Sequence, residues 1–163
     1  MEQMKAMVLR KLGSLSENPA PLSPAELPVP EPGAGAVLIR VSACGVCHTE
    51  LDEIEGRTPP PRLPVIPGHQ VVGRVAACGP GAPGCRIGDR VGVAWIHSAC
   101  GRCQWCTTGR ENLCPDFVAC GRDAAGGYAE YMTVPEDFAF EIPAVFSDSE
   151  AAPLLCAGAI GYR

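Results

Sequence analysis

Four cysteines stand close together in the middle of the chain and are separated by short spacers. They occupy positions Cys100, Cys103, Cys106 and Cys114. Two-residue spacers let thiolates surround one ion, and zinc takes four thiolates in a tetrahedron with Zn–S distances of about 2.3 Å. Because four thiolates fill the coordination sphere, this pattern predicts a structural zinc site. A 4Fe–4S cluster, which also uses Cys-x2-Cys-x2-Cys, and four free thiols are the alternatives.

Three further segments carry residue types that bind metals, but they are far apart in the sequence. They are Cys44–Thr49 (CGVCHT), Gly68–Gln70 (GHQ) and Pro153–Gly158 (PLLCAG). A single histidine is more often a core residue than a ligand, and a single cysteine is more often a small hydrophobic side chain. Taken one at a time, these segments therefore indicate no site.

The composition excludes several classes of protein. The chain has 163 residues, with 18 acidic and 13 basic side chains and a formal net charge of −5, which argues against a nucleic-acid-binding protein. Its length and its 47% hydrophobic residues are typical of one globular domain. No run approaches the roughly 18 apolar residues of a membrane helix, and the N-terminus lacks the pattern of a signal peptide. We therefore expect a cytoplasmic protein in which the clustered members of its ten cysteines are metal ligands and do not form disulfides.

The hydrophobic pattern predicts short strands and turns with two helical pieces. Helical composition covers residues 49–55, and Ser147 with Glu150 forms a capping box that opens a helix over residues 147–162. The proline-rich residues 15–35 and 58–67 are expected to be irregular loops. This arrangement predicts a mainly β protein, an irregular barrel or sandwich. The expected strands are residues 3–12, 37–41, 71–76, 89–95, 128–134 and 138–142.

The segment Gly79–Gly84 (GPGAPG) matches the dinucleotide-binding pattern GxGxxG letter by letter. That pattern works only where a helix follows, because the N-terminus of the helix meets the pyrophosphate. Here Pro83 and a short turn lead into another strand instead. We therefore predict that this segment does not contact a cofactor.

Six motifs occur in the order in which they occur in one enzyme family. They are ACGVCHTE, PGHQVVG, the turn Gly88–Val91, the four-cysteine segment, GGYAEY and EAAPLLCAG. In this the chain resembles the zinc-dependent alcohol dehydrogenases of the medium-chain dehydrogenase/reductase superfamily, from about residue 5 to the last residue. The resemblance implies that residues 1–163 form the GroES-like catalytic domain, a mainly β irregular barrel with short helices. It also implies that the cysteine-rich segment, about residues 97–123, forms a structural zinc lobe.

The resemblance also implies a catalytic zinc held by Cys47, His69 and Cys156. Three protein ligands leave the fourth position for water or an alcohol, which is typical of catalytic zinc. A zinc-bound alkoxide would then give up hydride to NAD(P)⁺ in a reversible reaction. Thr49 matches the hydroxyl that passes the substrate proton outward, and His48 matches a relay residue that also contacts the cofactor pyrophosphate.

The sequence departs from the family pattern at three positions near this site. Glu50 stands where the family usually has Asp, a carboxylate that orients the zinc-binding histidine, and we expect that interaction to survive the extra methylene group. Gln70 replaces a common Glu and removes one negative charge, so we hypothesise a more acidic zinc-bound oxygen. Asp52 replaces a common histidine; it either takes protons from the relay or is simply a solvated residue on a helix face.

The resemblance implies two zinc ions per chain, NAD(P) as cofactor and a small alcohol or aldehyde as substrate, with no nucleic-acid or membrane partner. No sequence signature of the family's Rossmann domain is present, so we expect a truncated catalytic half, with homo-oligomers only if a longer chain exists. The alternatives are a non-catalytic zinc-binding domain or gene remnant, and a barrel that serves as an interaction module. The remaining cysteines are expected to be ordinary buried or half-buried thiols. These are Cys44, Cys78, Cys85 and Cys120.

Overall fold

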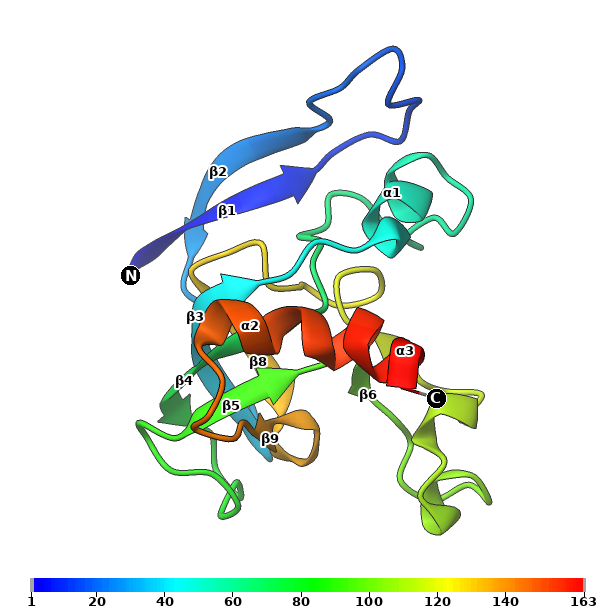
Figure 1. Cartoon of the computed structure of the whole chain (residues 1–163). Helices are drawn as coiled ribbons and strands as arrows, with labels where there is room; N and C mark the ends of the chain where they lie inside the picture. The colour runs from blue at the N-terminus through cyan, green and yellow to red at the C-terminus, as the bar shows by residue number, and fades with distance from the viewer. Residues whose placement is uncertain (1, 163) are drawn as a thin grey trace.

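Short β-strands account for most of the regular structure in the computed structural model, which describes residues 2–162 (Figure 1). The expectation of a mainly β fold with short helices is therefore confirmed. The strands are β1 Gln3–Leu9, β2 Leu22–Pro28, β3 Ala36–Cys44, β4 Val71–Cys78, β5 Arg90–Val93, β6 Ile96–Ser98, β7 Val118–Ala119, β8 Tyr131–Pro135 and β9 Phe140–Glu141. The helices are α1 His48–Ile54, α2 Asp148–Pro153 and α3 Ala159–Tyr162, with 3₁₀ turns at Cys106–Thr108, Glu111–Leu113 and Glu136–Phe138.

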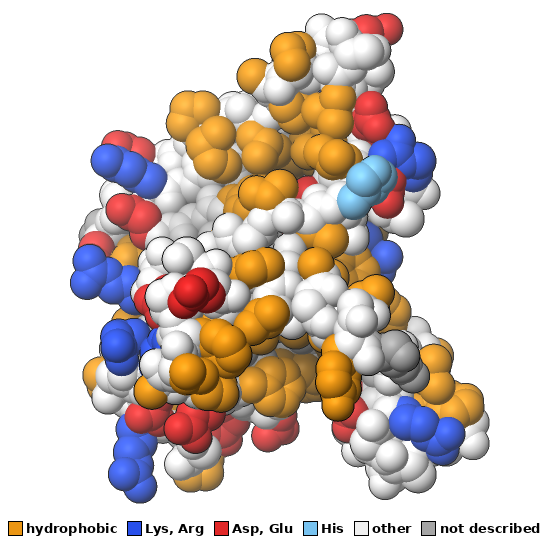
Figure 2. Space-filling model, viewed as in Figure 1, with side chains coloured by type: hydrophobic (Ala, Val, Ile, Leu, Met, Phe, Trp, Pro, Cys, Tyr) orange, Lys and Arg blue, Asp and Glu red, His pale blue; other side chains and the backbone are white. Residues whose placement is uncertain are grey.

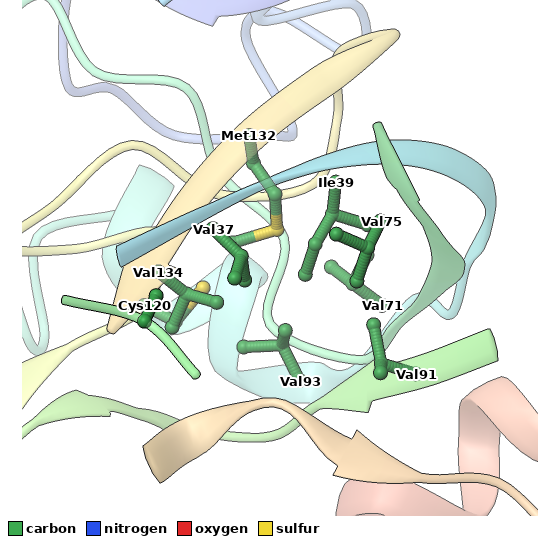
Figure 3. Packing of buried hydrophobic residues seen from close by; sticks show 10 residues of the cluster. Val37, Ile39, Val71, Val75, Val91, Val93, Cys120, Met132 and Val134 are labelled. Carbon is green, nitrogen blue, oxygen red and sulfur yellow. The ribbon is translucent and has the colours of Figure 1, made fainter. Parts of the chain in front are cut away.

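The main sheet is antiparallel and has the strand order β8-β3-β4-β5-β9. Its strands are rich in valine and isoleucine, which fit the pleated surface of a sheet. Side chains on alternate positions of β3 and β4 turn toward those of β5 and β8, and Figure 3 shows them converging between the strands. The buried cluster comprises Val37, Ile39, Val71, Val75, Ala82, Val91, Val93, Cys120, Met132 and Val134.

The first hairpin corrects one expectation from the sequence. Residues 15–35 were expected to be irregular throughout, but Leu22–Pro28 forms β2 and pairs with β1 over its whole length. Pro24 and Pro28 lack an amide donor, and an edge strand tolerates prolines whose missing donor faces away from the partner strand. The prediction of an irregular segment was therefore wrong for Leu22–Pro28, because a high proline content does not exclude an edge strand.

The C-terminal helical segment, here called the late helix, consists of α2, a π-helical turn at Leu154–Gly158 and α3. It starts at the predicted capping box, where the Glu150 backbone N–H donates to Ser147 Oγ and the Ser147 backbone N–H donates to Glu150 Oε2. Ala151 and Ala152 are buried against Val72 of β4. Figure 1 shows the late helix, in orange and red, lying across one face of the main sheet.

Two segments remain outside the regular elements as predicted. The Gly79–Gly84 segment joins β4 to β5, and no helix intervenes between those strands. Residues 58–67 contain no helix or named strand. Within residues 2–162, no helix is both long enough and apolar enough to cross a membrane.

Candidate metal centres

Cys47 is placed by the junction of β3 with α1. It is the N-cap of α1, with extended backbone angles, and its backbone N–H donates to Glu50 Oε2 at 2.7 Å. A carboxylate three residues into a helix accepts a hydrogen bond from an otherwise free backbone amide. Its negative charge also interacts favourably with the positive end of the helix dipole. This local bond fixes Glu50 with its second oxygen directed toward the interior.

His69 stands immediately before β4 and is only 1% exposed. Its Nδ1 atom lies 2.6 Å from Oε1 of the buried Glu50, and its ring meets that of Trp95 edge to face at 5.1 Å. The preceding Gly68 has φ +99°, and a Cβ atom there would lie 2.7 Å from the Tyr128 ring. Only glycine suits this position, so the backbone turn that aims His69 depends on it. The expected contact between Glu50 and the histidine is present.

Cys156 reaches the same place from the π-helical turn of the late helix. Its Sγ atom lies 3.9 Å from Sγ of Cys47, a residue 109 positions earlier. One ligand atom each of Cys47, His69 and Cys156 lie within 4.8 Å of one another. Two sulfurs on a tetrahedral zinc ion are about 3.8 Å apart, so the pair has the spacing that one ion requires. We call these three residues the three-ligand group.

The donor atoms of the three-ligand group are chemically suited to a metal. The Nε2 atom of His69 is buried without a hydrogen-bond partner in the described chain, which is costly unless an ion or water satisfies it. Burial acts to raise the pKa of the Cys47 thiol, but the backbone N–H and hydroxyl of Thr49 stabilise the thiolate and lower the pKa overall. Burial and the neighbouring Cys47 raise the pKa of Cys156 to about 11. Of the two thiols, Cys47 is therefore the one that ionises more readily.

Charge also favours a proton on the free imidazole. Burial acts to lower the pKa of His69, but the adjacent Glu50 carboxylate outweighs burial and raises the pKa overall. With Nδ1 beside the Glu50 carboxylate, Nε2 is the nitrogen left to face an ion. Carboxylate–histidine pairs of this kind fix the tautomer and orientation of a ligating ring.

The four cysteines predicted to form a closed site also come together, and we call them the four-thiol group. Their Sγ atoms all lie within 4.8 Å of one another. Cys106 Sγ is 3.9 Å from that of Cys100 and 3.6 Å from that of Cys103. The backbone N–H groups of Arg102 and Cys103 lower the pKa of Cys100 to about 6, and burial with the Cys103 side chain raises that of Cys106 to about 12. Cys114 completes the group and is buried.

The two residues predicted to relay protons occupy different surroundings. Thr49 Oγ1 lies 3.5 Å from Cys47 Sγ and lines a cleft of about 860 Å³. The His48 side chain is 75% exposed, and its Nδ1 atom lies 3.5 Å from Asp52 Oδ1. Asp52 also pairs with Arg57, which lowers the pKa of the Asp52 carboxyl. Thr49 therefore faces the cleft, whereas His48 and Asp52 form a contact at the protein surface.

The cleft connects the three-ligand group with the cysteine-rich segment. His69, Cys156 and Thr49 line it, and Trp95 and Leu155 contribute apolar surface. Figure 2 shows hydrophobic side chains gathered over the part of this face where the late helix lies. A pocket of mixed apolar and polar lining that ends at candidate metal ligands suits a small organic molecule.

Two buried polar side chains lie near this site: Glu53, which the sequence did not single out, and Gln70, which it did. Glu53 is 1% exposed, and its Oε1 atom has no hydrogen-bond partner in the described chain. Burial and the neighbouring Glu50 raise the pKa of Glu53 to about 7. The spacing of three between Glu50 and Glu53 on a helix could have indicated a shared face. Gln70 is also 1% exposed, and neither polar atom of its amide has a partner there.

Comparisons with known proteins agree on one family. Residues 33–144 match the alcohol dehydrogenase GroES-like domain. The chain is 49% identical over 165 residues to the probable alcohol dehydrogenase AdhA of Mycobacterium tuberculosis, covering 98% of this chain and 47% of that protein. The chain thus spans about half the length of the curated relatives it matches.

Solved structures give the same result. A thermostable alcohol dehydrogenase from Pyrobaculum aerophilum, bound to cobalt and zinc, has a TM-score of 0.83 and 34% identity over 94% of this chain and 45% of its own. A putative zinc-binding dehydrogenase from Sinorhizobium meliloti 1021, bound to NADP, has a TM-score of 0.81 and 35% identity over 94% and 42%. Sequence, fold and the convergence of the cysteines therefore agree, and this chain belongs to the alcohol dehydrogenase GroES-like domain family.

Proposed function

We propose that this chain is the metal-binding catalytic half of a zinc-dependent alcohol dehydrogenase, which transfers hydride reversibly between a small alcohol and NAD(P)⁺. The observation that carries the proposal is the convergence of Cys47, His69 and Cys156 beside a cleft of about 860 Å³, which His69 and Cys156 line. Three ligands facing a cleft suit a catalytic ion, whereas four thiolates suit a structural one. Residues 2–162 contain one group of each kind.

Each group has a separate role in this proposal. The three-ligand group would hold a catalytic zinc, which supplies Lewis-acid polarisation of the substrate oxygen. The four-thiol group would hold a structural zinc. Glu50 would orient His69 through Nδ1, and the apolar cleft wall would exclude water from the substrate carbon.

Proton movement would begin at Thr49. A hydroxyl both donates and accepts, so Thr49 can pass on the substrate proton without ionising itself. Its position in the cleft next to Cys47 supports this role. His48, exposed and beside Asp52, would carry the proton to solvent and would contact the cofactor pyrophosphate.

The nicotinamide cofactor needs surfaces beyond those described in residues 2–162. Hydride transfer requires the nicotinamide to be held against the substrate carbon. We therefore expect the 163-residue chain to bind two zinc ions but not to oxidise simple alcohols with NAD⁺ or NADP⁺. Turnover by this chain alone would contradict the need for a second domain.

Metal analysis tests the proposal directly. The chain should hold two zinc ions, Cys156→Ser should hold one, and Cys85→Ser, outside both groups, should still hold two. Cobalt substitution distinguishes the groups, because a tetrathiolate and a mixed sulfur–nitrogen site give different absorption spectra. A Cys156→Ser variant that keeps both ions would overturn the assignment of the three-ligand group. The alternative of a non-catalytic zinc-binding domain predicts two ions but no turnover even in a longer native protein.

A further inference from the structure

Two cysteines that belong to neither metal group mark the ends of one loop. Cys78 is the last residue of β4, and Cys85 follows the Gly79–Gly84 segment. The Cys78 thiol donates to the backbone carbonyl oxygen of Cys85, with Sγ 3.5 Å from that oxygen. The two ends of the loop therefore meet, although six residues separate them. We call residues 78–85 the neck loop.

The backbone of the neck loop is held in place by the rest of the barrel. The Gly79 N–H donates to the carbonyl oxygen of Ala36 at 2.8 Å, and the Gly84 N–H donates to Glu136 Oε2 at 2.6 Å. Ala82 at its tip is 8% exposed and belongs to the main core cluster. Both cysteines also pack against that cluster. Because these anchors fix the loop, the Cys78 thiol stays beside the backbone of Cys85 without any crosslink.

Small molecules can reach the neck loop from outside. Cys85 is half-buried and, with Gly84, lines a cavity of about 720 Å³, and neither residue lines the cleft at the three-ligand group. The sequence analysis regarded Cys78 and Cys85 as ordinary thiols. The contact of the Cys78 thiol with the Cys85 backbone and the cavity beside Cys85 together indicate a pair of cysteines that can react with each other.

We propose that Cys78 and Cys85 form a dithiol modification site that a low-molecular-weight disulfide, such as glutathione disulfide, converts to an intrachain disulfide. One cysteine thiolate attacks a glutathione sulfur, forms a mixed disulfide and releases one glutathione thiolate. The second cysteine then attacks the protein sulfur of that mixed disulfide and releases the second glutathione. Two protein thiols lose two electrons and two protons, and one glutathione disulfide becomes two glutathione molecules.

Closure needs the two side chains to approach each other. A disulfide places its Cβ atoms about 3.8 Å apart, and the Cys78 sulfur already lies 3.5 Å from the carbonyl oxygen of Cys85. Burial, with the nearby Glu136 and Asp89 carboxylates, raises the pKa of Cys85. The thiolate is the reactive form, so closure is slow and the pair stays reduced unless the oxidant persists.

Peptide mapping tests the proposal on the zinc-loaded chain. Trypsin cleaves after Arg74 and Arg86, so both cysteines lie in one peptide, residues 75–86. After incubation with glutathione disulfide and alkylation of the remaining thiols, this peptide should appear unalkylated and lighter by two hydrogen atoms. Dithiothreitol should restore both thiols. The closed loop should raise the melting temperature by about 5 °C.

Variants distinguish an intrachain bond from other products. Cys78→Ser and Cys85→Ser should each stop at a glutathione adduct and show no rise in melting temperature, and Cys120→Ser should close as the unmodified chain does. The zinc content should stay constant, which separates this outcome from any failure of the proposed function. Full alkylation of residues 75–86 after oxidation, or only single glutathione adducts in the unmodified chain, would overturn the proposal.

Discussion

At the scale of single residues, one carboxylate connects the start of α1 to the candidate catalytic centre. Glu50 accepts the Cys47 amide with one oxygen and faces His69 with the other. The longer side chain that replaces the family's aspartate therefore reaches the histidine. Glu53, three residues later in the chain, is also buried. Its carboxyl has no ion pair with Arg122, because the Arg122 guanidinium donates to the Asp123 carboxylate instead.

The raised pKa of Glu53 leads to a pH-dependent stability. The pKa of this carboxyl is about 7 in the folded chain and 4.5 in the unfolded chain. The protonated carboxyl therefore makes its full contribution to stability below about pH 4.5, and this contribution is lost as the pH rises through 7. Glu53→Gln imitates the protonated form. We expect the variant to be more stable than the unmodified chain at pH 8 by about 1–3 kcal/mol and to match it near pH 5.

Urea denaturation at several pH values measures this difference. The exposed Glu17→Gln serves as the matched control and should leave the pH dependence unchanged. A Glu53→Gln variant that is less stable than the unmodified chain at pH 8 would show that the carboxylate is ionised and needed in the fold.

Gln70 allows a test of how charge affects the three-ligand group. It is buried directly after His69, so Gln70→Glu would add a negative charge within one residue of the three-ligand group. We expect the pH midpoint of the absorption change of the cobalt-substituted chain to rise by about one unit. Asn112→Asp adds the same charge at an exposed position on the cleft wall and should shift the midpoint less. Identical midpoints in all three proteins would refute the hypothesis.

At the scale of elements, the cysteine-rich segment has little regular structure of its own. It contains the short strands β6 and β7 and two single 3₁₀ turns. The Arg110 guanidinium stacks on Trp105 at 4.8 Å, but a cation–π contact contributes only about 1 kcal/mol at an exposed site. The four-thiol group is therefore the main candidate for holding this segment together.

Cys103→Ser should remove that support. A closed zinc site contributes directly to folding, so we expect the variant to lose one zinc ion and about 3 kcal/mol or more of unfolding free energy. Thermal melting with zinc analysis measures both. Cys85→Ser, which removes a thiol outside the group, should keep two ions; a Cys103→Ser variant with full zinc content and unchanged melting would contradict the assignment.

At the scale of the whole molecule, the three-ligand group exists only while the late helix is docked on the barrel. Arg90 of β5 connects the two parts, because its guanidinium donates to Asp148 Oδ1 at 2.7 Å and to the carbonyl oxygens of Pro143 and Phe146. A planar guanidinium can make all three bonds at once, whereas a lysine ammonium cannot match that fork.

Arg90→Lys should therefore loosen the docked helix. We expect a loss of about 1–2 kcal/mol of stability and weaker cobalt binding at the three-ligand group, with no change at the four-thiol group. Cobalt titration followed by absorption separates the two groups. Arg74→Lys, an exposed arginine with a single bond to the Gly88 carbonyl oxygen, is the control; equal cobalt affinities in both variants would exclude a docking role for Arg90.

The sequence by itself determined the features that depend on short range. The spacing of Cys100 to Cys114 predicted a closed thiol group. The capping box at Ser147 and Glu150 predicted where the late helix begins. Both predictions rest on residues that are close in space because they are only a few positions apart in the sequence. The ligand set of the second group came from the family resemblance and not from spacing.

Only the tertiary structure decided the features that depend on contacts between distant segments. Cys47 and Cys156 meet across 109 residues because the late helix docks on the main sheet. The pairing of β2 with β1 overrides its prolines, and the burial of Glu53 and the contact between Cys78 and Cys85 follow from packing. The sequence shows which side chains are neighbours along the chain. Burial and contacts between distant residues arise only when the whole chain folds.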